Sequence, residues 1–134
     1  MRIKPITADN ACGLLYTRNC TRLARPLGLS PSVLLRLRRQ HPSCQRMGQF
    51  IFEALEVYFG DMFQLALLAP SVSDKIALKW LMPISPIKLP DDFPIRLTNF
   101  YEIRKGEYPL NQLSAVKRQA LDDYIRQEAR HWLI

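Results

Sequence analysis

The chain has 134 residues, which is enough for one compact domain and short for two. A hydrophobic content of 48% argues against wholesale disorder, and ten prolines against five glycines predict a fold divided into short elements. The three cysteines are an odd number, which argues against a secreted disulfide framework and favours a reducing, cytoplasmic compartment.

The positive charge is concentrated in the first third of the chain. Residues 1–46 hold nine basic side chains and one acid, for a net charge of +8, whereas residues 47–134 carry −1. Eight of the nine bases are arginines, which pair with phosphates and guanine edges through a planar fork that lysine lacks. Nucleic acid is therefore the first candidate partner, with an acidic protein or a membrane surface as alternatives. The nine bases are Arg2, Lys4, Arg18, Arg22, Arg25, Arg36, Arg38, Arg39 and Arg46.

We expect no secretory signal, because residues 6–10, which follow the basic residues 1–5, contain no apolar run of the needed length. A first helix is expected to begin after an Asp9 or Asn10 cap and to continue through Leu15. Gly13 weakens the interior of this helix.

Two further helices joined by a turn are predicted between Thr21 and Gln40, which read TRLARPLGLSPSVLLRLRRQ. Ala24 permits close approach of the two helices, Gly28 suits the turn, and Ser30 followed by proline is a strong helix start. This segment resembles the helix-turn-helix of DNA-binding proteins. The positions expected to face inward are Leu23, Leu27, Leu34 and Leu37.

The resemblance implies that residues 30–39 form the recognition helix. The start of that helix, with Ser30, Ser32 and Val33, would then approach base edges, and Arg36 would contact a base or a phosphate. The implied phosphate contacts are Arg22, Arg25, Arg38 and Arg39.

Pro26 departs from the helix-turn-helix pattern. Proline inside a helix removes a hydrogen bond and clashes with the carbonyl four residues earlier, at a cost of about 3 kcal/mol. We therefore expect one of two outcomes. Either the first helix ends by Arg25 and the turn is longer than in the family, or the segment is an ordinary helical corner with an arginine-rich solvated face.

The longest predicted helix runs from about Cys44 to Leu68. It is apolar over most of its circumference, so it belongs in the middle of a bundle or lies partly in an interface. Residues 50–69 are accordingly a candidate surface for a homodimer or a hetero-complex. Its narrow polar line consists of Gln49, Glu53, Glu56, Gly60 and Gln64.

A membrane span is not expected in this stretch, although its length would suffice. Glu53, Glu56 and Asp61 lie near its middle, where an acid costs roughly 2.5 to 3.5 kcal/mol on insertion scales. We therefore predict a soluble protein that does not bind membranes.

The remainder of the chain is predicted from its caps and prolines. A short helix should follow a Ser71 or Ser73 cap, and four closely spaced prolines predict an extended connector over residues 83–96. Residues 97–110 admit a short β-hairpin, which Pro109 would confine to a sheet edge.

A closing helix is expected after an Asn111 or Ser114 cap. The charged residues Arg118, Asp122 and Arg126 recur at steps of four on what we expect to be its solvated outer side.

Metal binding and catalysis receive little support. His41 and Cys44 have metal-ligand spacing and could complete a zinc site with Cys12 and Cys20, but buried thiols are the commoner state of free cysteine. Neither histidine lies in a recognisable nucleophile setting, and no glycine-rich phosphate loop occurs. We predict no cofactor, no metal and no enzymatic activity.

The sequence thus predicts a mainly α, single-domain helical bundle that binds DNA and regulates transcription, as a dimer. The alternative is a non-enzymatic adaptor or assembly component that grips an acidic protein through its basic N-terminal third. The expected parts are residues 1–46 as a basic helical segment, 47–82 as core helices, 83–96 as the connector, and 97–134 as the hairpin with the closing helix.

Overall fold

The computed structural model describes residues 2–40 and 48–134, and these form a mainly α bundle. Within this described part there is no sheet, and the extended backbone makes two isolated antiparallel bridges, Ile3 with Leu133 and Arg18 with Ile84. The predicted fold class is confirmed. The helices are α1 (Ala8–Leu15), α2 (Cys20–Leu27), α3 (Pro31–Arg38), α4 (Gln49–Leu68), α5 (Asp74–Leu81), α6 (Leu97–Lys105) and α7 (Ala115–Trp132), with the 3-10 turns η2 (Pro86–Lys88) and η3 (Leu110–Gln112).

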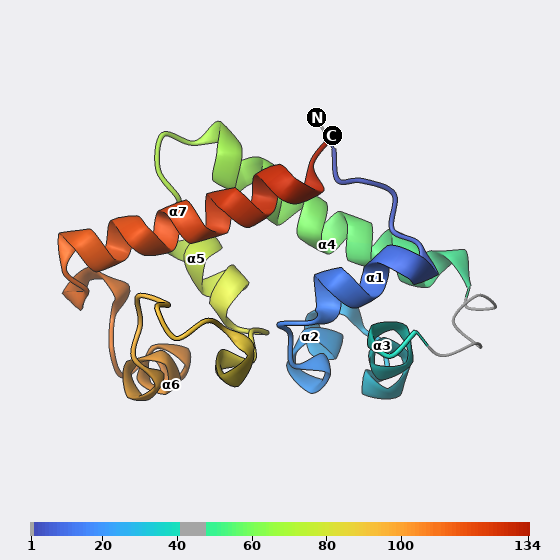
Figure 1. Ribbon diagram of the computed structural model, residues 1–134, viewed down its shortest axis with the longest axis horizontal. Helices are drawn as coiled ribbons and strands as arrows, with labels where there is room; N and C mark the ends of the chain where they lie inside the picture. The colour runs from blue at the N-terminus through green and yellow to red at the C-terminus, as the bar shows by residue number, and fades with distance from the viewer. Residues whose placement is uncertain (1, 41–47) are drawn as a thin grey trace.

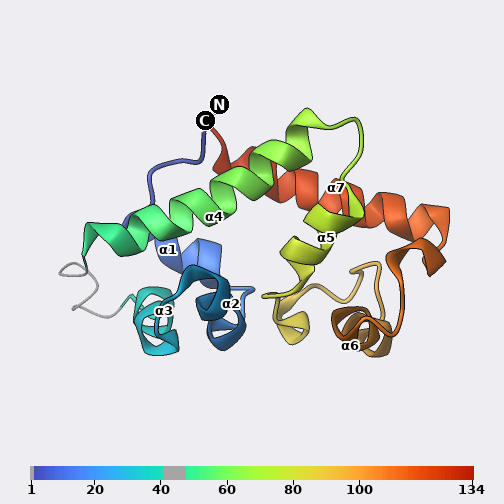
Figure 2. The ribbon, with the colours of Figure 1, turned by 180° about the vertical axis from the view of Figure 1, so that it is seen from behind.

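Helices α4 and α7 are the two longest elements, and they cross on one side of the molecule (Figure 1). Seen from behind, α4 lies in front of α7, and α5 descends from the pair toward the opposite side (Figure 2). The three N-terminal helices form one end of that opposite side and α6 forms the other. The core between these elements contains Trp80, Phe59, Phe63 and Phe100.

The two ends of the chain lie together. The amide of Lys4 donates to the carbonyl of Trp132 at 2.8 Å, and the amide of Ile134 donates to that of Arg2 at 2.9 Å. The N-terminal segment then runs along α4, where the amide of Ile6 donates to Glu56 at 2.8 Å. The polar line predicted on the long helix is therefore partly covered by the chain's own N-terminus.

The long helix α4 exposes part of its apolar surface. Phe50, Val57, Leu65 and Leu68 are between 53% and 70% exposed, while the opposite side of the helix is fully buried. The expected start of this helix near Cys44 lies outside the described residues.

Helix starts follow local side-chain chemistry. Ser73 caps α5 and Ser114 caps α7, each accepting from a backbone amide of the first turn, as predicted. Helix α1 begins two or three residues earlier than expected, because Thr7 is its cap. Thr7 and Asn10 form a reciprocal capping box, in which each side chain accepts from the other's backbone amide.

The predicted hairpin over residues 97–110 is wrong, because Leu97–Lys105 is helix α6. Phe100 and Ile103 lie three residues apart on one helical face, and both are buried. Gly106 ends the helix in the left-handed conformation at φ 76°, and its amide returns to the carbonyls of Glu102 and Ile103. The Arg-Lys-Gly sequence that suggested a hairpin turn is thus a helix C-terminus.

The predicted solvated side of α7 is also wrong at its three charged positions. Asp122 is 4% exposed and accepts from the amide of Val72 at 2.9 Å, and Arg126 pairs with it at 2.6 Å. Arg118 and Arg126 donate to the carbonyls of Val72 and Ala69 at 2.6 and 2.7 Å. These side chains satisfy the backbone of the α4–α5 connection, which helical spacing within α7 could not reveal.

Among the described residues, the most buried charged side chain is that of Arg18, which is 1% exposed. Its guanidinium forms a two-pronged ion pair with Glu128 of α7 and donates to the carbonyl of Leu14 at 3.0 Å. Glu128 also accepts from the indole of Trp80 at 2.9 Å. The guanidinium lies 5.0 Å from the ring centre of Phe59, within cation–π range.

Replacing Arg18 with methionine should lower the free energy of unfolding by up to about 3 kcal/mol, because Glu128, which is only 21% exposed, would lose its cation. The double variant Arg18→Met/Glu128→Gln should lose much less, since both charges are removed and Trp80 keeps an acceptor. Urea unfolding followed by circular dichroism measures both. The control is Asp74→Asn at the exposed Arg118 pair, where we expect about 1 kcal/mol or less. An unchanged urea midpoint for Arg18→Met would contradict this role.

Candidate nucleic-acid interface

The segment that resembles a helix-turn-helix forms two helices joined by a short turn. Asn19 caps α2 by accepting from the amide of Arg22, and Gly28 ends the helix in the left-handed conformation at φ 66°. The amide of Leu29 donates back to the carbonyl of Ala24 at 3.1 Å, which closes the helix end. Three residues separate α2 from α3, which has Pro31 at its first position.

Helix α2 does not end before Pro26, so the first of the two expected outcomes, a helix that ends by Arg25 and a longer turn, is wrong. Pro26 lies in the last turn of a helix that reaches Leu27. The missing proline amide leaves the carbonyl of Arg22 without its usual helical donor, but both residues are exposed, so water can hydrate that carbonyl. The turn is therefore short.

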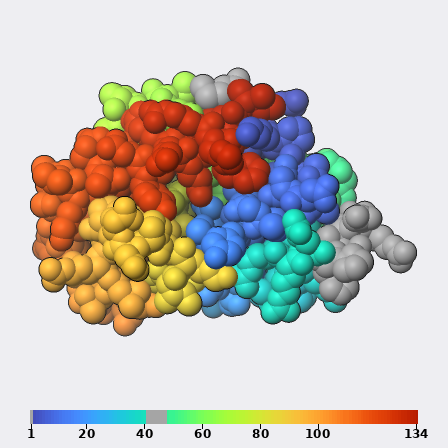
Figure 3. All heavy atoms as spheres, in the orientation of Figure 1, coloured from blue at the N-terminus to red at the C-terminus, as the bar shows by residue number. Residues whose placement is uncertain are grey.

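The four leucines expected to face inward are wholly or partly buried. Leu23, Leu34 and Leu37 are fully buried, Ala24 is 2% exposed, and Leu27 is half-buried against the core. Helix α3 packs against both α1 and α2, and Figure 3 shows these three helices adjoining at one corner of the molecule. The pair is thus held by a third helix and by the main core.

Six of the eight predicted contact residues are exposed: Arg22, Arg25, Ser30, Ser32, Arg36 and Arg39. Val33 is half-buried. Arg38 is also half-buried, and it donates to the carbonyl of Arg18 at 3.0 Å, so part of its guanidinium holds α3 to the core. The cations that face solvent therefore come from both helices of the pair.

The sequence suggested that the side chain of Ser30 caps α3. In the structure Ser30 is at the cap position, but its side chain makes no capping hydrogen bond. Its hydroxyl instead shares a hydrogen bond of 2.8 Å with the hydroxyl of Ser32. Both hydroxyls lie on the exposed start of α3, where a helix N-terminus favours anions.

Three cations from later in the chain lie near side chains of the first three helices or of their connections, and sequence reasoning missed them. The ammonium of Lys88 lies 4.7 Å from the ring centre of Tyr16, and Lys79 lines a cavity together with Arg22. Arg104 of α6 has its pKa lowered to about 10, mainly by burial and further by the positive charge of Arg22. No local signal could have found these residues, because they lie at least 50 positions from the helices that they approach.

The zinc hypothesis finds no support in the described residues, where no three metal-ligating side chains cluster. Cys12 is half-buried and Cys20 is buried, while His41 and Cys44 lie outside the described residues. Burial raises the pKa of the Cys20 thiol, an effect that Arg38, Arg39 and Lys88 only partly oppose.

Searches against protein-family models, curated proteins and solved structures found no match to this chain. Among the described helices, none combines the length and the apolar character that crossing a membrane requires.

Cys20 should be a slow thiol. Its raised pKa lowers the reactive thiolate fraction at pH 8, about tenfold for each pKa unit, and burial blocks reagents further. In a Cys12→Ser/Cys44→Ser variant, we expect iodoacetamide to alkylate Cys20 at least tenfold more slowly in the folded protein than in urea. The matched control, Cys20→Ser/Cys44→Ser, keeps the more accessible Cys12, which should react faster. Equal folded and unfolded rates for Cys20 would contradict its burial.

Proposed function

We propose that this protein binds duplex DNA through α2 and α3 and acts as a non-enzymatic, cytoplasmic regulator of transcription. The observation that supports the proposal most strongly is the α2–α3 pair itself. It combines a short turn, a left-handed Gly28 and buried contact residues with an outer surface of arginines and serines. This is the arrangement that lets a helix enter the major groove while its neighbour contacts the backbone.

Charge supports the same proposal. No acidic residue occurs between Asp9 and Glu53, so the exposed arginines of α2 and α3 have no acid on their own segment. Arginines on this surface would neutralise phosphates on both sides of a groove and release the ions condensed there. In the proposed complex, Arg22, Arg25 and Arg39 hold phosphates, and Ser32 with Arg36 faces base edges.

The second candidate is an adaptor that binds an acidic protein partner. The exposed stripe of α4, formed by Phe50, Val57, Leu65 and Leu68, favours it. The same side of α4 also carries the exposed acid Asp61. A surface that mixes apolar and charged side chains is typical of protein interfaces, and a second copy of the chain would cover it equally well. A homodimer through α4 would present two α3 helices, so the dimer is compatible with the DNA proposal.

Salt dependence separates the two candidates. We expect binding to a labelled random duplex to weaken steeply with salt, with a log–log slope of roughly 0.9 per phosphate contact. Arg25→Gln and Arg39→Gln should each weaken binding and reduce that slope by about 1, because each removes one contact. Fluorescence anisotropy between low and moderate salt measures both quantities.

The matched control is Arg130→Gln, which removes an exposed cation from the last turn of α7 and should leave affinity and slope unchanged. Ser32→Ala should leave binding to the random duplex nearly unchanged and alter the preference in a sequence-selection experiment. No binding at low salt would overturn the DNA proposal. Retention of an acidic protein with a weak salt dependence would then favour the adaptor.

A further inference from the structure

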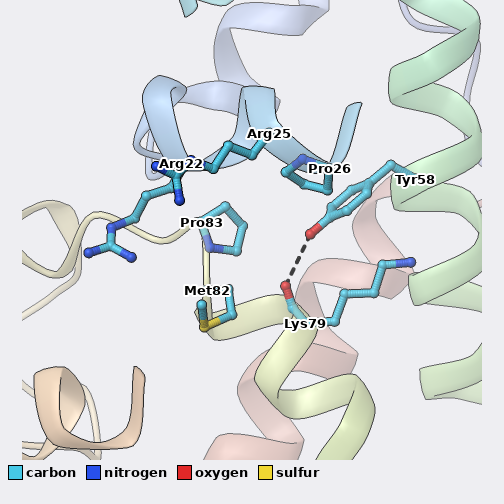
Figure 4. Close-up of a pocket in the computed structure, with 7 residues that line it drawn as sticks. All are labelled: Arg22, Arg25, Pro26, Tyr58, Lys79, Met82 and Pro83. Carbon is cyan, nitrogen blue, oxygen red and sulfur yellow. Dashed lines mark hydrogen bonds between the residues drawn. The ribbon is translucent and has the colours of Figure 1, made fainter. Parts of the chain in front are cut away.

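A cavity of about 370 Å³ lies between α2 and α5, and the side chain of Tyr58 from α4 forms one of its walls (Figure 4). Arg22, Arg25 and Pro26 line it from α2, Met82 and Pro83 line it from the end of α5, and Tyr58 lies opposite. This volume lies within the range of small-molecule sites.

The wall of the cavity is predominantly apolar. The rings of Pro26, Pro83 and Tyr58 and the thioether of Met82 supply it. The hydroxyl of Tyr58 is already committed, because it donates to the carbonyl of Lys79 at 3.2 Å, and burial raises the pKa of this phenol. Tyr58 therefore presents a neutral aromatic ring to a ligand.

All charged residues that line the cavity are cationic. Arg22, Arg25 and Lys79 line it, and no acidic residue does. Within residues 2–40 and 48–134, no carboxylate forms an ion pair with either arginine. The ammonium of Lys79 lies 4.6 Å from the ring centre of Tyr58, where it makes a cation–π contact. The two arginines are therefore the stronger anion-binding groups.

We propose that this cavity binds a small organic anion, with an apolar aromatic or branched body against Tyr58, Met82 and the prolines, and a carboxylate- or sulfonate-type group on Arg22 and Arg25. An apolar body alone would leave the two guanidinium groups without a counterion at the rim. An inorganic anion alone would leave the apolar wall in contact with water. Only a ligand with both parts satisfies both surfaces.

The cavity and its charges are the same without DNA, so ligand binding here does not depend on the proposed function. Ligand binding in this cavity would nevertheless affect α2. A ligand anion on Arg22 and Arg25 occupies the groups that we assign to phosphates, so ligand and duplex would compete for the same helix.

The experiment is isothermal titration calorimetry of the full chain, without DNA. It compares three probes that carry the aromatic ring system with the negative charge, the ring system alone, or the charge alone. Naphthalene-2-sulfonate carries both features, naphthalene-2-sulfonamide keeps the ring system without the charge, and inorganic sulfate keeps the charge alone. We expect saturable one-to-one binding of the sulfonate, about tenfold tighter than the sulfonamide, since hydrogen bonds to charged groups are stronger than neutral ones. Sulfate should show no saturable binding at equal concentration.

Two substitutions assign the site. Arg25→Gln should weaken sulfonate binding about tenfold and leave the sulfonamide unchanged, because only the anion contact is lost. Arg39→Gln makes the same charge change on α3, outside the cavity, and should leave both probes unchanged. Equal affinity for the two naphthalene probes, equal losses in the two variants, or no saturable sulfonate binding would overturn the inference. Because no duplex is present, failure of DNA binding would leave this result unaffected.

Discussion

The ion pair between Arg18 and Glu128 is the contact on which the arrangement of the helices depends. A cation that is 1% exposed must recover a hydration energy of many kcal/mol from its neighbours, which restricts it to a small set of geometries. Arg18 does so through Glu128, the carbonyl of Leu14 and the ring of Phe59. These partners belong to α7, α1 and α4, so one side chain fixes three helices relative to each other.

The same cluster reaches the basic surface. Glu128 accepts from Trp80 of α5, and the carbonyl of Arg18 accepts from Arg38 of α3. The α2–α3 pair is therefore attached to the core by a polar contact as well as by its buried leucines. Such attachment favours binding to a rigid partner, because the two helices are held in a fixed orientation before binding and less entropy is lost in the complex.

Arginine serves two opposite purposes in this molecule. Arg18, Arg118 and Arg126 point inward and satisfy carboxylates or carbonyls of connecting segments. Arg22 and Arg25, on the outer side of α2, line a cavity whose charges are all positive. Because the guanidinium stays charged in either setting, its position alone decides whether it stabilises the fold or attracts an anion.

The local elements could be read from the sequence because caps and breakers act within a few residues. Ser73, Ser114, Gly28 and the Ser30-Pro31 start mark helix ends where the structure has them. The sequence-based prediction was wrong where the same short sequence is compatible with two structures. Arg-Lys-Gly at 104–106 fits a hairpin turn and a helix C-terminus equally well, and only the burial of Phe100 and Ile103 decides between them.

The sequence by itself therefore determined the helical class, the basic first third and the α2–α3 segment, since composition and short-range spacing encode these properties. Tertiary structure decided which charges remain on the surface. It buried Arg18 and Asp122, turned Arg38 toward the core, and brought Lys79 and Arg104 close to Arg22 of α2. The physical reason is that the environment of a charge depends on chain segments far away in sequence, which no local pattern records.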